Sequence, residues 1–163
     1  MDDELTLKQQ LSQLIISEAQ QQQLDAMLLG LKEGIGAKSV LLIERSGLLL
    51  GSYGQEVIND LSISSLIAGI FKSLTALTAL LGERDIQTLA HRGSRGNLLF
   101  ALLGSQDILA VMVPPEVDPA SVEADIEAAM SQLTPILLAA RESTKGKSFS
   151  FSKDSISMFL GKL

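Results

Sequence analysis

Apolar positions recur at helical spacing twice before residue 37. The first stripe lies between Leu7 and Ile15, and the second runs from Leu24 to Leu31 and is followed by glycines at positions 34 and 36, which favour the end of a helix. Ser17-Glu18-Ala19-Gln20 has the spacing of a capping box and marks a new start between the two. The pattern predicts a short N-terminal helix followed by the first helix of the main domain.

Short apolar runs bounded by turn-forming residues predict five β-strands. Neighbouring runs are joined by short turns, which favours antiparallel pairing. The runs are Ser39–Ile43, Leu48–Gly54, Ile86–Arg92, Gly96–Leu103 and Asp107–Val113.

Two longer helices complete the pattern. One extends from Asp60 to Gly82, and the other begins at Asp118-Pro119, an N-cap followed by proline at the first helical position, with a kink expected at Pro135. The order helix, two strands, helix, three strands, helix predicts an α+β fold, in which a five-stranded antiparallel sheet has helices on both faces.

The helix predicted over residues 61–82 has apolar residues on two sides, whereas an ordinary surface helix carries charges on its outer side. Lys72 is the one charged residue in this segment. The large side chains predicted to share one stripe are Ile63, Leu66, Ile67, Ile70, Leu74, Leu77 and Leu81. The opposite stripe consists of Ser65, Gly69, Lys72, Ala76 and Ala79.

Three arrangements fit such a helix: burial within its own domain, passage through a membrane, or packing against a helix of another subunit. Lys72 near its middle disfavours a membrane span, because a charge there is costly. A domain this small has difficulty covering both sides of the helix. We therefore expect packing between subunits, with Lys72 at the edge of the contact, where its ammonium group stays in water.

The composition narrows the functions further. The chain is 46% apolar, and this excess of apolar residues indicates that part of its surface is covered by a partner. It has no cysteine and a single histidine, His91, which excludes disulfides, thiolate metal sites and multi-histidine metal sites within one chain. The net charge of −6 argues against nucleic-acid binding. The acidic N-terminus lacks the apolar region of a secretory signal, so we expect a cytoplasmic protein. We also expect neither a cofactor nor a metal.

Taken together, the pattern resembles the roadblock / dynein light chain family. The resemblance is carried by Ser39–Tyr53, Leu61–Gly82 and Ile86–Val113. Within the family the chain is most similar to the bacterial polarity regulators, through the hairpin Leu42–Gly47 and the helix end Leu80–Glu83. It departs from them by a longer N-terminal helical extension and by Lys72. The resemblance divides the chain into an N-terminal helical extension (residues 1–19), a roadblock domain (20–142) and a C-terminal tail (143–163).

The resemblance implies a non-catalytic homodimer that serves as a platform for a small Ras-like GTPase. Family dimers pair their middle helices and third strands, so that two sheets become one, and the paired helices carry the GTPase. The residues implied at the dimer contact are Leu66, Ile70, Leu77, Ile86, Thr88 and Ala90. Those implied at the GTPase contact are Ser65, Ala68, Gly69, Lys72, Ser73 and Ala76, with Phe159 and Leu160 in the tail.

Two functions follow from this resemblance. The first is stimulation of GTP hydrolysis by reshaping the loops of the GTPase, without a catalytic arginine from the regulator. The second is a scaffold or adaptor of the same fold without effect on GTP hydrolysis. Neither the GTPase itself nor the choice between stimulated hydrolysis and stimulated nucleotide exchange follows from the sequence.

The C-terminal tail has a pattern of its own. Ser148–Ser152 alternates serine with phenylalanine, as in a strand or an extended docking peptide, and Ile156, Phe159 and Leu160 follow at helical spacing. Docking on the chain's own domain and docking on another chain both fit this pattern, and binding to a membrane surface is a third reading.

Several features that suggest catalysis are better explained otherwise. Gly34–Ser39 lacks the spacing of a phosphate-binding loop. His91 lies in a predicted strand, and no nucleophile elbow accompanies it. Arg92 and Arg95 flank a turn, and we expect solvated charges there rather than an arginine supplied to a GTPase. We therefore expect no enzymatic activity of the chain itself.

Overall fold

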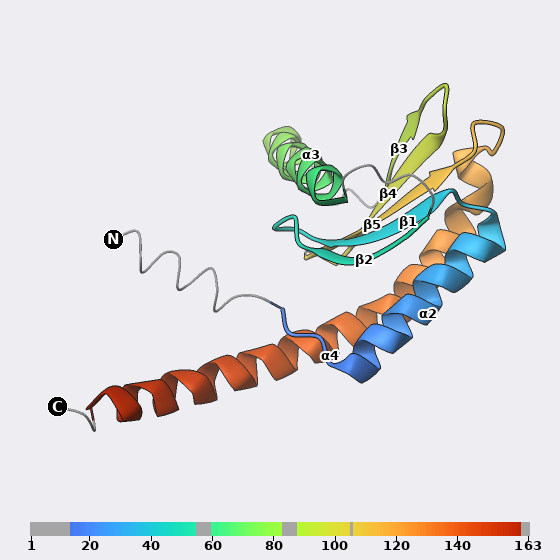
Figure 1. Cartoon of the computed structure of the whole chain (residues 1–163). Helices are drawn as coiled ribbons and strands as arrows, with labels where there is room; N and C mark the ends of the chain where they lie inside the picture. The colour runs from blue at the N-terminus through green and yellow to red at the C-terminus, as the bar shows by residue number, and fades with distance from the viewer. Residues whose placement is uncertain (1–13, 55–59, 83–87, 105, 161–163) are drawn as a thin grey trace. The chain divides into compact units, whose positions relative to one another are not determined.

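The computed structural model describes the backbone of residues 14–54, 60–82, 88–104 and 106–160, and the side chains of these residues apart from 60–61 and 146–160. The predicted order of helices and strands is confirmed (Figure 1). The first predicted helix lies mostly outside the described residues, and Leu14 and Ile15 precede α2 without regular structure. The elements are α2 (Glu18–Ile35), β1 (Ser39–Glu44), β2 (Leu49–Gly54), α3 (Asp60–Leu81), β3 (Thr88–Arg92), β4 (Asn97–Leu103), β5 (Asp107–Val113) and α4 (Pro119–Leu160).

The five strands form one antiparallel sheet in the order β2-β1-β5-β4-β3. In β1, which lies between β2 and β5, consecutive residues Ser39–Ile43 are all buried. Because successive side chains of a strand point to opposite faces, both faces of the sheet must be covered. Figure 1 shows α3 on one face and α2 with the first part of α4 on the other.

The core has one layer on each side of the sheet. On the α3 side, Ile67 and Phe71 join a buried cluster with residues of β1, β4 and β5. The rings of Phe71 and Phe100 meet edge to face, with centroids 6.2 Å apart and planes at 77°. On the other side, α2 packs closely on β2, since a Cβ at Gly51 would lie 2.6 Å from Cδ1 of Leu28. The buried residues of α2 and of α4 up to residue 134 are Leu24, Leu28, Leu31, Pro119, Val122, Ile126, Ala129 and Leu133.

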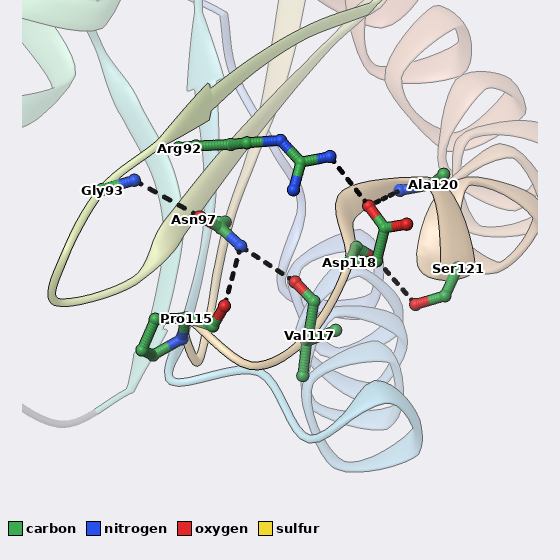
Figure 2. A network of polar contacts seen from close by, with 8 residues as sticks. All are labelled: Arg92, Gly93, Asn97, Pro115, Val117, Asp118, Ala120 and Ser121. Atoms are coloured by element: carbon green, nitrogen blue, oxygen red, sulfur yellow. Dashed lines mark hydrogen bonds and ion pairs between the residues drawn. The ribbon is translucent and has the colours of Figure 1, made fainter.

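A buried asparagine ties the β3–β4 hairpin to the loop that precedes α4. Asn97 is 3% exposed, and its Nδ2 donates to the carbonyl oxygens of Val117 (2.9 Å) and Pro115 (3.4 Å), while its Oδ1 accepts from the N–H of Gly93 (3.3 Å) (Figure 2). An apolar residue could satisfy none of these backbone groups.

The predicted N-cap of α4 is confirmed, and it also pairs with β3. Oδ1 of Asp118 accepts a hydrogen bond from the N–H of Ala120 (3.3 Å) and forms an ion pair with Nη2 of Arg92 (3.0 Å) (Figure 2). Both partners are largely exposed, so the ion pair contributes little to stability. It does hold the Arg92 side chain against the start of α4.

The C-terminal helix differs from the prediction. Helix α4 continues without interruption from Pro119 to Leu160, so Ser148–Ser152 are helical rather than extended. Pro135 removes one backbone donor but does not end the helix. No glycine or proline occurs between Lys147 and Leu160, so nothing in that stretch stops the helix from propagating.

By their contacts, residues 23–134 form one compact unit, and the parts before residue 23 and after residue 134 form a second. In the second unit, the hydroxyl of Thr144 accepts a hydrogen bond from the N–H of Ile15 (2.9 Å) and donates to the carbonyl of Ala140 (2.8 Å). Thr144 is buried. This hydroxyl therefore fixes the segment before α2 on α4.

We expect Phe71→Ala to lower the free energy of unfolding by about 3–5 kcal/mol, because it removes the ring that packs on Phe100 and leaves a cavity under α3. Phe71→Leu keeps most of the apolar volume and should cost about 1.5 kcal/mol. Urea unfolding followed by circular dichroism measures both. Equal stability of the two variants would mean that the ring is not part of a well-packed core.

We expect Asn97→Asp to be more destabilising at neutral pH than Asn97→Ala. The alanine variant leaves backbone groups unpaired, at a cost of about 1–3 kcal/mol. The aspartate variant also places a carboxylate against the carbonyl oxygens of Val117 and Pro115. The folded state of the aspartate variant then favours the protonated acid. The difference in the free energy of unfolding between the aspartate and alanine variants should therefore shrink as the pH falls. A gap between the two variants that does not change with pH would contradict this account.

Candidate functional site

Helix α3 buries only one of its sides. Ser64, Ile67, Ala68 and Phe71 are buried, and their spacing of three, four and seven residues places them on one face toward the sheet. The helix is therefore not wholly covered by its own domain. Of the predicted stripe of large residues, Ile67 is buried on the sheet-facing side and Leu66 is not, and Phe71, which lies outside that stripe, is also buried there.

The large residues outside the core form a ridge along the helix. Leu66, Ile70 and Leu77 are 69%, 43% and 51% exposed, respectively. Leu80 and Leu81 near the end of α3 are also exposed. Exposed apolar side chains gathered on one element are typical of a surface that is covered in an assembly.

Small residues occupy the part of α3 that faces away from the sheet (Gly69 and Ser73) and the adjoining flank next to Lys72 (Ser65 and Ala76). Ser65, Gly69, Ser73 and Ala76 are all exposed. A Cβ at Gly69 would meet no heavy atom within 4 Å, so another backbone could approach closely there. Ala68, which the resemblance assigns to partner binding, is 6% exposed, so its side chain is not available to a partner in this chain.

The turn between β1 and β2 sets the rotation of α3 about its axis. Gly47, with a φ of 99°, lies so close to α3 that a Cβ on it would be 3.4 Å from Cα of Ser65. On the other side of the core, Phe71 contacts Phe100 of β4. The flank with Ser65 and Lys72 therefore faces the β1–β2 hairpin, and the ridge of Leu66, Ile70 and Leu77 faces toward β4 and β3.

Strand β3 is an edge of the sheet on the side of that ridge. It pairs with β4, and in the described part of the chain no other strand lies beside it. Thr88 and Ala90 are exposed, as the dimer prediction requires, and Ile86 lies outside the described residues. The side chains of Phe159 and Leu160 also lie outside the described residues, although their backbone belongs to α4.

Several titratable side chains elsewhere in the domain have defined partners. Arg92 is paired with Asp118, and the backbone carbonyl of Arg95 accepts a hydrogen bond from Nζ of Lys38 (2.8 Å). Burial, together with a hydrogen bond to Asp25 and the charge of that carboxylate, raises the pKa of Tyr53 to about 12. Its phenol is therefore protonated at neutral pH. In the described residues, no three His, Cys, Asp or Glu side chains gather as a metal site would need.

One helix in the described chain, Ser62–Leu81, has the length and mean hydropathy (1.6) that a membrane span would need, and 28% of it is buried. Its sheet-facing side contributes Ile67 and Phe71 to the domain core. The long apolar stretch thus forms one layer of an α+β domain.

Phe71 was not predicted from the sequence to be part of the core, although it is the one aromatic residue of α3 and stands four positions after Ile67.

No family model matches the chain, and no curated protein matches it either. Among solved structures, MglB of Myxococcus xanthus is 28% identical with a TM-score of 0.72, over 78% of this chain and 96% of that chain. An MglB with a tetrameric arrangement is 23% identical, with a TM-score of 0.70 over 78% and 96% of the two chains. A Roadblock/LC7 domain from Streptomyces avermitilis is 20% identical, with a TM-score of 0.64 over 70% and 97%. The fold and the resemblance predicted from the sequence are thereby confirmed: the chain has a roadblock-type fold and is similar in structure to MglB.

Proposed function

We propose that the chain is a non-catalytic homodimeric platform for a small Ras-like GTPase, and that the outer side of α3 carries both contacts. The observation that carries this proposal is the exposed apolar side of α3, above all Leu66 and Leu77. Burying such a side chain contributes about 1.5–3 kcal/mol relative to leaving it in water. A second copy and a GTPase together would cover the ridge and the small residues.

The ridge and the open edge of β3 support the dimer contact. A twofold axis beside β3 would let the β3 strands of two copies pair, which removes the unpaired edge of each sheet. The same axis would bring the two ridges of Leu66, Ile70 and Leu77 together, because they face the β3 side. The solved MglB with a tetrameric arrangement supports assembly as a property of this kind of protein.

The small residues support the GTPase contact. In such a dimer, Gly69 and Ser73 of each copy would point away from both sheets, with Ser65 and Ala76 on the adjoining flank. These small side chains would let a partner approach the helix closely. The family resemblance supplies the class of partner, a Ras-like GTPase, and supports stimulation of its GTP hydrolysis. In this proposal, Phe159 and Leu160 of the tail add to that contact.

We expect Ile70→Glu to dissociate the dimer, because it buries a carboxylate in the middle of the ridge. Leu29→Glu on α2 is a matched control, since Leu29 is 41% exposed and Ile70 is 43% exposed. Sedimentation equilibrium at several concentrations should give a monomer for the first variant and a dimer for wild type and control. A wild-type monomer, or a dimer that survives Ile70→Glu, would contradict the proposed contact.

We expect Gly69→Arg to abolish binding of the GTPase while the chain stays folded. A side chain at Gly69 meets open space in the single chain, and replacing a helical glycine even favours the helix by about 1 kcal/mol. Gly30→Arg on α2 is the control, because a Cβ there also meets no atom within 4 Å.

Binding is measured against the small Ras-like GTPases of the same genome, each loaded with a GTP analogue, and single-turnover GTP hydrolysis separates an activator from an adaptor. Equal affinity of the two arginine variants for the GTPase would overturn the assignment of the platform to α3.

A further inference from the structure

Lys72 is the one charged residue between Leu61 and Leu81, and its side chain is exposed on the flank of α3 that faces the β1–β2 hairpin. In the described part of the chain, no hydrogen bond or ion pair joins its ammonium group to another residue. The side chain therefore stands as a single cation on an otherwise uncharged helix surface.

The helices on the other face of the sheet carry an acidic exposed surface. Helix α4 carries exposed Glu123, Asp125 and Glu127 and no lysine or arginine between residues 119 and 134. Asp25 and Glu33 add to them on α2, which covers the same face (Figure 1). An acidic partner is therefore repelled by the α2 and α4 side, whereas Lys72 is the one charge between residues 61 and 81 of α3.

A partner that covers α3 has to accommodate this ammonium group. Burying an unpaired charge costs several kcal/mol, whereas a carboxylate in the partner offsets that cost. A second copy offers no carboxylate from residues 61–81 of its own α3, because this stretch contains no aspartate or glutamate. Lys72 also lies on the flank away from the ridge that the second copy would cover.

We propose that the surface which the GTPase presents to α3 is acidic and places a carboxylate against Lys72, an inference that rests on the proposed function. Lys72 then determines which GTPase is accepted, because a partner with a neutral or basic surface would leave the ammonium group unpaired. An anionic membrane is a weaker occupant, since a single cation near a lipid surface is worth only about 1 kcal/mol.

The test uses the full chain with Lys72→Glu, Lys72→Met and, as a control of equal charge change on α2, Lys32→Glu. Affinity for the GTP-analogue-loaded Ras-like GTPases of the same genome is measured at about 50 mM and about 300 mM NaCl, which spans a large change in screening. We expect Lys72→Glu to weaken binding at least about tenfold, and Lys72→Met to weaken it less and to remove most of the salt dependence. Lys32→Glu should bind as wild type does.

The results distinguish failure of the Lys72 contact from failure of the proposed GTPase platform. If Gly69→Arg abolishes binding while Lys72→Glu binds as tightly as wild type, the platform stands and the acidic contact is overturned. If Lys72→Glu dissociates the dimer in sedimentation and Lys32→Glu does not, Lys72 lies in the dimer contact and the inference is overturned. Vesicles of phosphatidylserine that bind wild type but not Lys72→Glu would assign the lysine to a membrane instead. Failure of wild type to bind any of the GTPases would overturn the proposed function itself.

Discussion

The one-sided packing of α3 on the sheet is the constraint on which the rest of the molecule depends. Phe71 and Ile67 anchor the helix on the sheet beside Phe100, and the sheet can cover only the side that these residues occupy. The opposite sheet face is already covered by α2 and α4 (Figure 1). In residues 23–134, no further layer lies over the outer side of α3, so its apolar residues meet water unless another molecule covers them.

The two faces of the sheet differ in chemistry as well as in packing. The helices of one face carry exposed carboxylates such as Glu123, Asp125 and Glu127, whereas Lys72 is the one charged residue from 61 to 81 in the helix of the other face. Solubility can therefore be provided by α2 and α4, while α3 remains apolar. This separation of roles is consistent with a docking protein, because the docking side can be optimised for contact without removing the charges that keep the chain in solution.

Small structural details determine which part of α3 is available to which molecule. The close approach of Gly47 to Ser65 turns the ridge of Leu66, Ile70 and Leu77 away from the β1–β2 hairpin. The hydrogen bonds of Asn97 hold the β3–β4 hairpin against the loop before α4 (Figure 2). In the proposed dimer, a second copy would meet both the ridge and the open edge of β3.

The sequence by itself determined the elements, their order and the unusual apolarity of α3, because hydrophobic periodicity, turn residues and caps such as Asp118 are local signals. It did not determine how α3 is rotated, since a helix that is apolar on several sides has no unique inner face. Ala68 was therefore assigned to a partner, and Phe71 was left out of the core. Nor did it reveal Asn97, whose partners are 18 and 20 residues away. Only the tertiary structure decided these points, because they depend on which groups the fold brings within contact distance.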